Sequence, residues 1–333
     1  MRRLITLAWS ALASAAIAAS LQFAGAAAAQ ETYPTRTVRF ILPYGAASAT
    51  DIAARMFADR LSQLWGKPVV VENRPGGDGL VSMNAFISAN DDHTLWFGPA
   101  AAFTTLPYMH DTLSSDPGPK MTPVASVVNV ALAVSTPAAM KIDSIDALVK
   151  LARSEPGKLN GSAANGVSDF LLFGFFKKLG LEVTEVPYRD IMQAPNDLVA
   201  GRIQVLSTSI AVVQPLANAG KIKILAVSSR QRAPSQPDVP TAIEAGYPDL
   251  TFESIGGVFA PPSMTLKVRN QIAADFQKVA QDNPEIGKRL NLTGQFVSIR
   301  GPAAFGAAIK EQRDKLAELA KILGITAARP EGR

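Results

Sequence analysis

Apolar runs of strand length alternate with amphipathic helical segments along most of the chain. In the first part, the pattern predicts strands at 37–42, 68–71 and 94–97 and helices at 51–65 and 80–89. A second series starts with an apolar run at 122–134 and comprises helices at 144–154, 168–179 and 194–200 and strands at 159–162, 182–186, 203–206 and 222–227. This alternation is typical of an α/β protein with mostly parallel sheets.

The end of the chain indicates that it returns to its first part. A strand at 251–259 is followed by helices at 266–282 and 303–323. The first series has too few helices to cover both faces of a sheet, so we expect the C-terminal segment to pack there. The chain would then cross between two lobes twice, near 127–129 and 252–256, as a two-strand hinge beside a cleft. We predict lobe 1 from residues 30–127 and 253–333 and lobe 2 from residues 128–252.

The N-terminus is typical of a secretory leader. Arg2 and Arg3 precede an apolar, Ala-rich run at 4–19, and the small residues at 26–29 suit a signal peptidase. The apolar run is short for a membrane span, and no later segment offers about twenty continuous apolar residues. We therefore predict a signal peptide at residues 1–29 and an exported, soluble mature protein.

Composition excludes several classes of function. The formal net charge is +5, and loss of a leader that carries Arg2 and Arg3 reduces it to +3. Without a Lys/Arg-rich stripe interleaved with aromatic residues, this small excess does not predict nucleic-acid binding. The chain has no cysteine and only two histidines, His93 and His110. Disulfides, thiolate metal sites, thiol nucleophiles and histidine metal clusters are therefore excluded, and we expect no cofactor.

Turns after the predicted strands are the candidate ligand site. In an open α/β sheet, ligands bind outside the carboxyl ends of the strands. Small residues let a ligand approach the backbone there, and the unpaired N–H groups of a first helical turn favour an anion. The turns at 44–51 and 162–168 both join a strand to a helix start, so together they would hold one carboxylate from two sides. Two further candidate turns are 98–104 and 188–193.

Several features near these turns allow two interpretations. Arg189 would pair with a ligand carboxylate or remain a solvated surface residue. Asp51 would complement the helix dipole or hold its own turn, and would then act on a ligand only indirectly. The glycine-rich loop at 73–79 lacks the lysine and Ser/Thr of a P-loop, so we interpret it as a structural turn. There is no Gly-x-Ser-x-Gly elbow, metal-ligand spacing or identifiable carboxylate pair, and we predict that the protein is not an enzyme.

Six ordered motifs resemble one known family. They are Tyr33-Pro34 with Arg36, residues 69–76 (Val-Val-Val-Glu-Asn-Arg-Pro-Gly), residues 156–159 (Pro-Gly-Lys-Leu), residues 186–188 (Val-Pro-Tyr), residues 220–227, and residues 237–246. Together they resemble the Bug family, the periplasmic solute receptors of tripartite tricarboxylate transporters. The resemblance covers essentially the whole mature chain.

The resemblance implies a two-lobe periplasmic binding protein of type II, the Venus-flytrap fold, located in the periplasm. It implies a small organic acid in the interlobe cleft and membrane permease subunits as partners. We expect the receptor itself to be a monomer. In this family, backbone groups and ordered waters of the turn after the first strand, and of its counterpart in the other lobe, hold the ligand carboxylate. By position, these turns are 44–51 and 162–168 here.

The chain departs from the family pattern at four places. Gly45-Ala46-Ala47-Ser48 replaces the usual Ala-Pro-Gly-Gly, Phe170 replaces a frequent histidine, and Asp190 replaces a glycine. The acidic residue expected after the strand at 203–206 appears as Ser207 or Thr208, which argues against an amino-acid ligand. Asp190 would repel a second ligand carboxylate unless it faces away from the cleft.

We therefore predict a receptor for a small carboxylic acid, with a dicarboxylate favoured over an aromatic or other monocarboxylate. A sensing receptor that docks on a sensor kinase and an exported enzyme remain alternatives. Phe103, Phe170 and Met192 would supply an apolar wall or belong to the core. The expected ligand-binding residues are Tyr44, Ala46, Ala47, Ser48, Ala49, Thr50, Asp51, Gly98, Ala100, Ser162, Asn165, Gly166, Val167, Ser168, Asp190 and Thr208.

Overall fold

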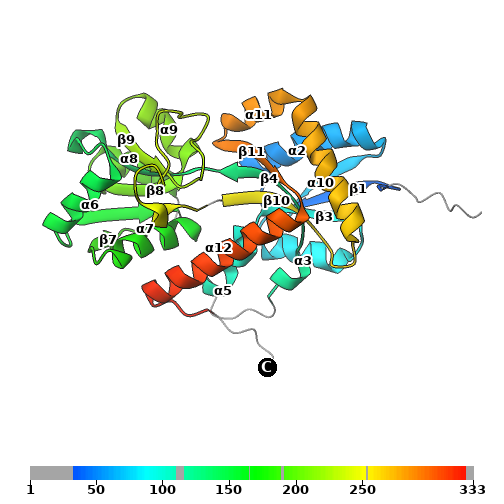
Figure 1. The fold of residues 1–333 in the computed structure, drawn as a ribbon, viewed down its shortest axis with the longest axis horizontal. Helices are drawn as coiled ribbons and strands as arrows, with labels where there is room; N and C mark the ends of the chain where they lie inside the picture. The colour runs from blue at the N-terminus through cyan, green and yellow to red at the C-terminus, as the bar shows by residue number, and fades with distance from the viewer. Residues whose placement is uncertain (1–32, 110–115, 165, 189–190, 253, 328–333) are drawn as a thin grey trace, which may run out of the picture. The chain divides into compact units, whose positions relative to one another are not determined.

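The computed structural model describes residues 33–109, 116–164, 166–188, 191–252 and 254–327 (Figure 1). The chain divides into two units, residues 1–36 and 37–333. Of the first unit, the structure describes residues 33–36, which include a cis peptide bond between Tyr33 and Pro34. The predicted signal peptide lies outside the described residues. The second unit contains the two sheets described below.

The first sheet has six strands in the order β11-β4-β10-β3-β1-β2. Its members are β1 (Val38–Leu42), β2 (Val69–Asn73), β3 (Thr94–Pro99), β4 (Thr122–Val130), β10 (Ser254–Ala260) and β11 (Gln295–Arg300). Strand β1 pairs in parallel with β2 and β3, whereas β10 runs antiparallel to β3 and β4, and β11 antiparallel to β4. The carboxyl ends of β1, β2 and β3 therefore meet at one edge.

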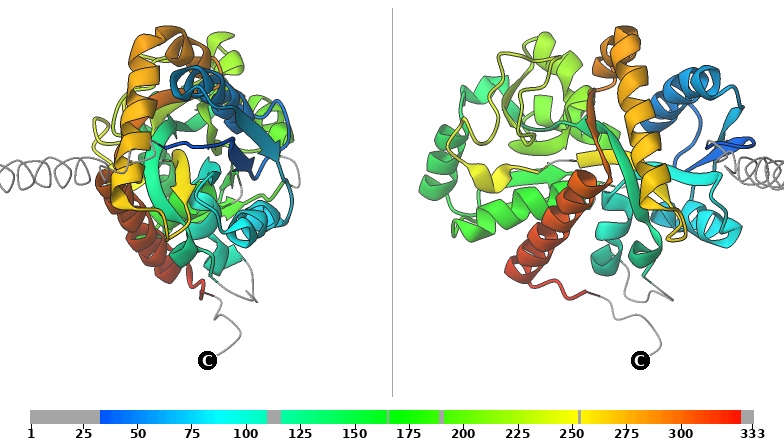
Figure 2. Two further views of the ribbon diagram at one scale, coloured as in Figure 1. Left: turned by 90° about the vertical axis from the view of Figure 1, so that its right-hand side faces the viewer. Right: turned by 45° about the vertical axis from the view of Figure 1, so that its right-hand side comes forward.

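Alternation along the strands of the first sheet supplies two buried faces. On one face, Phe40 stacks on Phe276 of α10 (Leu266–Asp282), which also contacts Phe57 of α2 (Ala49–Trp65). On the other face, Ile41 and Trp96 share a core with α3 (Leu80–Ala89), the short helix α4 (Ala101–Thr104) and the first half of α12 (Pro302–Leu323). Figure 2 shows these helices flanking the sheet. The sheet is thus covered on both sides.

The second sheet has five strands in the order β7-β6-β8-β5-β9. They are β5 (Leu132–Pro137), β6 (Leu159–Ala163), β7 (Val183–Glu185), β8 (Val205–Ser209) and β9 (Ile222–Val227). One core cluster joins this sheet to α6 (Ile145–Ser154) and α7 (Val167–Lys178), and another joins it to α8 (Ala194–Val199) and α9 (Ile210–Asn218). The second sheet therefore also lies between helices.

Both sheets are mixed, so the expectation of mostly parallel sheets was wrong. The apolar run at 122–134 contains two strands, because β4 ends at Val130 in the first sheet and β5 begins at Leu132 in the second. Strand β5 then runs antiparallel to β8 and β9. The pattern analysis also missed α9, α11 (Pro284–Asn291) and β11. The lobe boundaries at 127/128 and 252/253 remain predictions.

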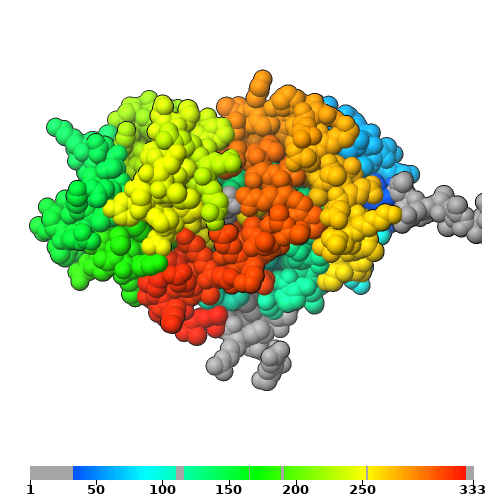
Figure 3. Space-filling view, in the orientation of Figure 1, coloured from blue at the N-terminus to red at the C-terminus, as the bar shows by residue number. Residues whose placement is uncertain are grey.

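Helix α12 belongs to the cores of both sheets. Its first half places Phe305 and Ile309 in the core of the first sheet, and its second half places Leu316 and Leu319 in that of the second. The second half packs on α7 at Gly174, where a Cβ atom would lie 2.6 Å from a methyl group of Leu319. Figures 1 and 3 show α12 (red) passing from one set of elements to the other. Helix α12 therefore packs against both sheets and connects their cores.

Candidate functional site

A cavity of about 570 Å³ is lined by elements of both sheets. From the first part of the chain come the turn after β1, the loop after β2, α4 and α5 (Leu106–Met109), and from the second part come β5 and the start of α7. The lining residues are Pro43, Tyr44, Gly45, Pro75, Gly76, Gly77, Asp78, Gly79, Pro99, Ala101, Ala102, Thr105, Met109, Leu132, Gly166, Val167, Ser168 and Ser254. We call this cavity the interlobe pocket.

The turn after β1 is fixed by the start of α2. Ser48 is the N-cap of the helix, and its hydroxyl oxygen accepts a hydrogen bond from the backbone N–H of Asp51 at 3.2 Å. Ala47 adopts the left-handed region with φ of 64°, which is uncommon for a residue other than glycine. Its N–H donates to the Asp51 carboxylate at 2.9 Å, which holds this conformation. Hydrogen bonds to the backbone N–H and the carboxylate of Asp51 therefore hold the conformation of this turn.

Asp51 is buried, and both of its carboxylate oxygens accept hydrogen bonds. Its carboxylate accepts hydrogen bonds from the Arg55 guanidinium at 3.1 Å and from the Asn73 amide at 2.9 Å, in addition to Ala47. The Asn73 amide also donates to the carbonyl oxygen of Tyr44 at 2.9 Å. Although burial opposes ionisation, these hydrogen bonds and the Arg55 charge hold the pKa of Asp51 below its usual value. Asp51 thus favours its charged form and holds the turn by hydrogen bonds. Any effect of Asp51 on a ligand would be indirect, through the orientation of this turn.

Only the first two residues of this turn line the interlobe pocket. Tyr44 and Gly45 line it, and Tyr44 is 42% exposed. The predicted residues Ala46, Ala47, Ser48, Ala49, Thr50 and Asp51 are not part of its lining. Ala47, Ser48 and Asp51 instead hold the geometry of the turn through their mutual hydrogen bonds.

The glycine-rich loop after β2 also lines the pocket, in residues 75–79. The sequence analysis assigned this loop a structural role only, and so missed its position. Because β2 pairs in parallel with β1, the loop after β2 lies at the same sheet edge as the turn after β1. The available signal was the aspartate inside the glycine run, a charged side chain in a loop of otherwise small residues.

The turn after β3 contributes different residues from those predicted. A Cβ atom at Gly98 would lie 2.5 Å from the Trp96 ring, so packing requires the glycine there. Ala100 is fully buried, and its N–H donates to the carbonyl oxygen of Ile255 at 2.9 Å. The pocket is lined instead by their neighbours Pro99, Ala101, Ala102 and Thr105.

Residues Gly166, Val167 and Ser168 at the start of α7 line the pocket opposite, in the second part of the chain. Gly166 has φ of 86°, and its N–H donates to the Asp169 carboxylate at 3.1 Å. Ser162 is buried in β6 and lies outside the lining. Asn165 lies outside the described residues. This turn resembles the first one, because an aspartate in the first helical turn binds a backbone N–H.

The electrostatic surroundings of Asp169 are unlike those of Asp51. Burial, followed by the negative charge of Glu185, raises the pKa of Asp169 to about 7, while the hydrogen bond from Gly166 acts in the opposite direction. No described residue forms an ion pair with Asp169. The aspartate of the second turn therefore titrates near neutral pH.

The remaining predicted contacts lie away from the pocket or outside the described residues. Thr208 is buried in β8 opposite Ala133, and Asp190 and Arg189 lie outside the described residues. Phe103 belongs to the core of the first sheet, and Phe170 packs edge-on against Tyr108 of α5 with ring centroids 5.8 Å apart. Met192 is 58% exposed and is not part of the lining. These residues form no apolar wall of the pocket.

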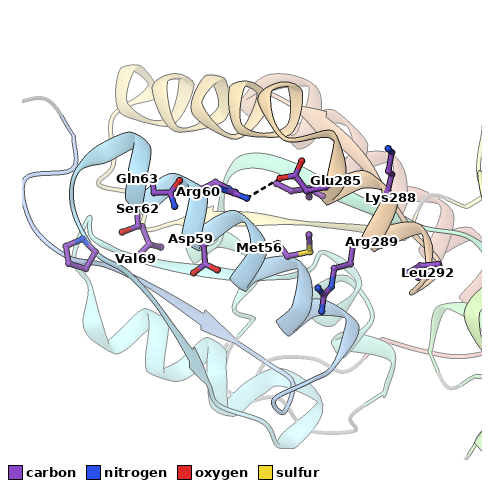
Figure 4. A pocket seen from close by; sticks show the side chains of 12 residues that line it. Met56, Asp59, Arg60, Ser62, Gln63, Val69, Glu285, Lys288, Arg289 and Leu292 are labelled. Atoms are coloured by element: carbon purple, nitrogen blue, oxygen red, sulfur yellow. Dashed lines mark hydrogen bonds and ion pairs between the residues drawn. The ribbon is translucent and has the colours of Figure 1, made fainter.

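A larger cavity, of about 1070 Å³, lies elsewhere, between α2 and α11 (Figure 4). Its lining mixes both signs of charge, including the ion pair between Arg60 and Glu285 at 3.2 Å. It contains neither of the two turns and none of the predicted contacts. The interlobe pocket is the better candidate site, because it combines the start of α7 and the first residues of the turn after β1 with small residues that expose the backbone.

Two α/β sheets joined by crossing strands, with a pocket at the ends of their strands, define a two-lobe periplasmic binding protein. None of the helices in the described part of the chain is long and apolar enough to cross a membrane.

The family model of the tripartite tricarboxylate transporter family receptor matches residues 53–324, and the chain belongs to this family. Members are solute-binding receptors rather than enzymes; they bind small carboxylates and serve tripartite transporters.

Individual relatives agree with this assignment. BugT of Bordetella pertussis is 30% identical over 276 residues, which cover 80% of this chain and 81% of BugT. The structure of Rhodopseudomonas palustris Rpa4515 with adipate has a TM-score of 0.70 at 25% identity and covers 88% of this chain and 99% of that one. MatC from the same organism, with bound malate, has a TM-score of 0.66 at 25% identity, covering 86% of this chain and 99% of MatC.

Proposed function

We propose that the protein captures a small organic carboxylate in the interlobe pocket and delivers it to a tripartite tricarboxylate-type membrane permease. The observation that carries this proposal is that the first residues of the turn from β1 to α2 and the start of α7 line one pocket formed by both lobes. Backbone N–H groups at such positions suit a carboxylate because they are rigid and need no side-chain ordering. No lysine or arginine occurs among the described lining residues, so the backbone would supply most of the donors.

The family and the leader support a permease partner and a periplasmic location. Residues 1–29 have the composition of a signal peptide, which supports export. The receptor would act as a monomer that presents its closed, ligand-bound form to the permease. A dicarboxylate remains favoured over a monocarboxylate, supported by the adipate and malate found in the two Rhodopseudomonas palustris structures.

A thermal-shift panel tests this function. Mature protein, unfolded and refolded to remove any retained ligand, is incubated with mono- and dicarboxylates of two to eight carbons. We expect at least one acid to raise the unfolding midpoint in a concentration-dependent way, because ligand binding stabilises the folded state. No shift with any acid would contradict the proposed function.

A matched pair of variants links the shift to the interlobe pocket. Ala102 lines the pocket, and its Cβ lies 3.6 Å from where a Cβ of Gly79 would be, so Ala102→Leu narrows the site. Ala304 is exposed on α12, so Ala304→Leu makes the same change away from the pocket. We expect Ala102→Leu to weaken the ligand-induced shift at least about tenfold in ligand concentration and Ala304→Leu to leave it unchanged. Equal responses from both variants would place the ligand elsewhere.

A further inference from the structure

Helix α12 packs on a glycine at two places, one in the first sheet and one in α7. In the first half of the helix, Phe305 covers Gly257 of β10, where a Cβ atom would lie 2.5 Å from the phenyl ring. In the second half, Leu319 covers Gly174 of α7, where a Cβ atom would lie 2.6 Å from a methyl group of Leu319. Because both partners lack a side chain, α12 packs directly against backbone at each place.

The two elements that α12 contacts in this way both reach the interlobe pocket. Strand β10 begins at Ser254, which lines the pocket, and α7 begins at Val167, which lines it together with Gly166 and Ser168. The structure describes all of α12, and no residue of this helix is part of the lining. Helix α12 therefore connects one lining element to another from outside the pocket.

Polar contacts add to the packing of α12 along α7 (Figure 1). Lys178 of α7 forms an ion pair with Glu318 of α12 at 3.3 Å, and the Lys177 ammonium donates to the carbonyl oxygen of Leu323 at 3.3 Å. Exposed pairs of this kind contribute little to stability. The buried contact between Leu319 and Gly174 is therefore the one to which we assign the placement of α7.

The length of α12 fixes the separation of its two contacts. The helix is continuous from Pro302 to Leu323. Leu319 follows Phe305 by 14 residues, so the two contacts lie about 21 Å apart along the axis at about 1.5 Å per residue. Since the backbone hydrogen bonds of a helix resist a change in its length, α12 acts as a rigid spacer between β10 and α7.

We infer that Gly174 and Leu319 are positioning residues for the ligand, because their contact lets α12 hold the start of α7 in place relative to the first sheet. This inference rests on the proposed function and deepens it. A carboxylate held from both sides needs donors at hydrogen-bond distance on each side, and such distances span only about 0.5 Å. A displacement of α7 would therefore weaken binding although every lining residue stays the same.

The first test adds a methyl group to the contact. Gly174→Ala places a Cβ atom against Leu319, so one of the two helices must shift. Alanine favours a helix more than glycine does, so weaker binding would not come from a less stable α7. Calorimetric titration of the refolded variant uses the acid that gives wild type the largest thermal shift. We expect about tenfold weaker affinity, the loss from one misplaced hydrogen bond to a charged group.

A compensating substitution shows whether the contact itself is responsible. Leu319→Ala removes the methyl group that faces Gly174 and leaves a cavity, and we expect about fivefold weaker affinity from this change alone. In the double variant, the added methyl group occupies part of that cavity. The Cβ atom of Leu319, which alanine retains, lies 3.6 Å from its position, an ordinary contact. We expect the affinity of the double variant to return to within about threefold of wild type.

A matched control separates placement of α7 from stability. Leu148 of α6 is fully buried in the same core cluster as Leu319 and lies outside the pocket lining. Leu148→Ala should lower the urea midpoint by at least as much as Leu319→Ala, because both delete the same buried group. Its affinity for the acid should stay within about twofold of wild type.

The outcomes are distinguishable. The inference is overturned, and the proposed function stands, if Gly174→Ala binds within about twofold of wild type, if the double variant shows no recovery, or if Leu148→Ala weakens binding as much as Leu319→Ala. If Gly174→Ala does not fold, the double variant and the comparison of Leu319→Ala with Leu148→Ala decide by the same criteria. If no acid binds the wild type, the proposed function and this inference both fail.

Discussion

The two turns at the interlobe pocket share one hydrogen-bond arrangement but differ in the electrostatic surroundings of their aspartates. In each, an aspartate in the first turn of a helix accepts a hydrogen bond from a backbone N–H of the turn, Asp51 from Ala47 and Asp169 from Gly166. Asp51 also binds Arg55 and Asn73, and its pKa is lowered. Asp169 has the negative charge of Glu185 nearby, and its pKa is raised to about 7.

This difference indicates that the two turns are stabilised to different degrees. The first is held by the buried Asp51 carboxylate, whose lowered pKa favours its charged form, and the same network binds the end of β2 through Asn73. The second depends on a carboxyl group whose charge changes near neutral pH. We therefore regard the turn after β1 as the rigid side of the site and the start of α7 as its adjustable side.

The largest expected effect comes from removing the acid of the rigid turn. Asp51→Ala deletes the acceptor for Ala47, Arg55 and Asn73 and leaves the Ala47 N–H without its partner in a strained conformation. We expect the free energy of unfolding to fall by about 3 kcal/mol, the range for loss of a buried charged hydrogen-bond network. Urea denaturation measures this, with Asp59→Ala on the same helix as an exposed control that should change stability by less than about 0.5 kcal/mol. Similar losses from both variants would refute the role given to Asp51.

A second prediction tests the opposite pKa shifts. For Asp169, the raised pKa means that the folded state favours the protonated form, so the wild type loses stability as pH rises from about 4 through 7. Asp169→Asn keeps an oxygen acceptor for Gly166 but cannot ionise. Above pH 7 the variant should therefore be more stable than the wild type, by roughly 1–2 kcal/mol after allowance for solvent screening.

Asp51→Asn should show the opposite slope. The lowered pKa of Asp51 stabilises the folded protein above the ordinary aspartate pKa, and this contribution is lost as pH falls through the folded-state value. Denaturation curves from pH 3.5 to 8.5 for wild type and both variants, with exposed Asp238→Asn as a control, measure the slopes. Two results would contradict the electrostatic difference between the turns. One is a stability difference between Asp169→Asn and the wild type that does not depend on pH, and the other is the same sign of pH dependence for both variants.

The smallest effect concerns Ser48. Its hydroxyl caps α2 through the Asp51 N–H, so Ser48→Ala should lower stability by about 1 kcal/mol. Because Ser48 is outside the pocket lining, the affinity for the best acid should stay within about twofold. A tenfold weaker affinity with unchanged stability would make the hydroxyl a ligand contact and not a cap. Calorimetric titration and urea denaturation of the same preparation distinguish these results.

Local features of the fold could be predicted from the sequence. The strands β1 and β3 and the helices α2, α3 and α10 follow directly from hydrophobic periodicity, since each depends on residues close in sequence. The turn at 44–51 was recognisable for the same reason. The strand directions and the division of the apolar run at 122–134 between two sheets depend on partners far along the chain, so periodicity does not determine them.

The site was predictable only in part. Tyr44, Gly166, Val167 and Ser168 are predicted residues that line the pocket, but Asp78, Met109 and Leu132 were not foreseen. Their positions depend on the neighbouring placement of β1 and β2 and on the approach of α5 to α7, which are long-range properties. Likewise, the apolar positions of α12 predict a helix, but nothing in their spacing shows that two separate cores share it.

The most direct test of the central claim is a crystal structure of the refolded protein with the acid that binds most tightly. We expect the acid in the interlobe pocket, with its carboxylate oxygens within hydrogen-bond distance of backbone N–H groups, or of waters held by them, from both the turn at 44–51 and the start of α7. A ligand in the larger cavity between α2 and α11, or a carboxylate bound by only one of the two turns, would contradict the proposed binding site.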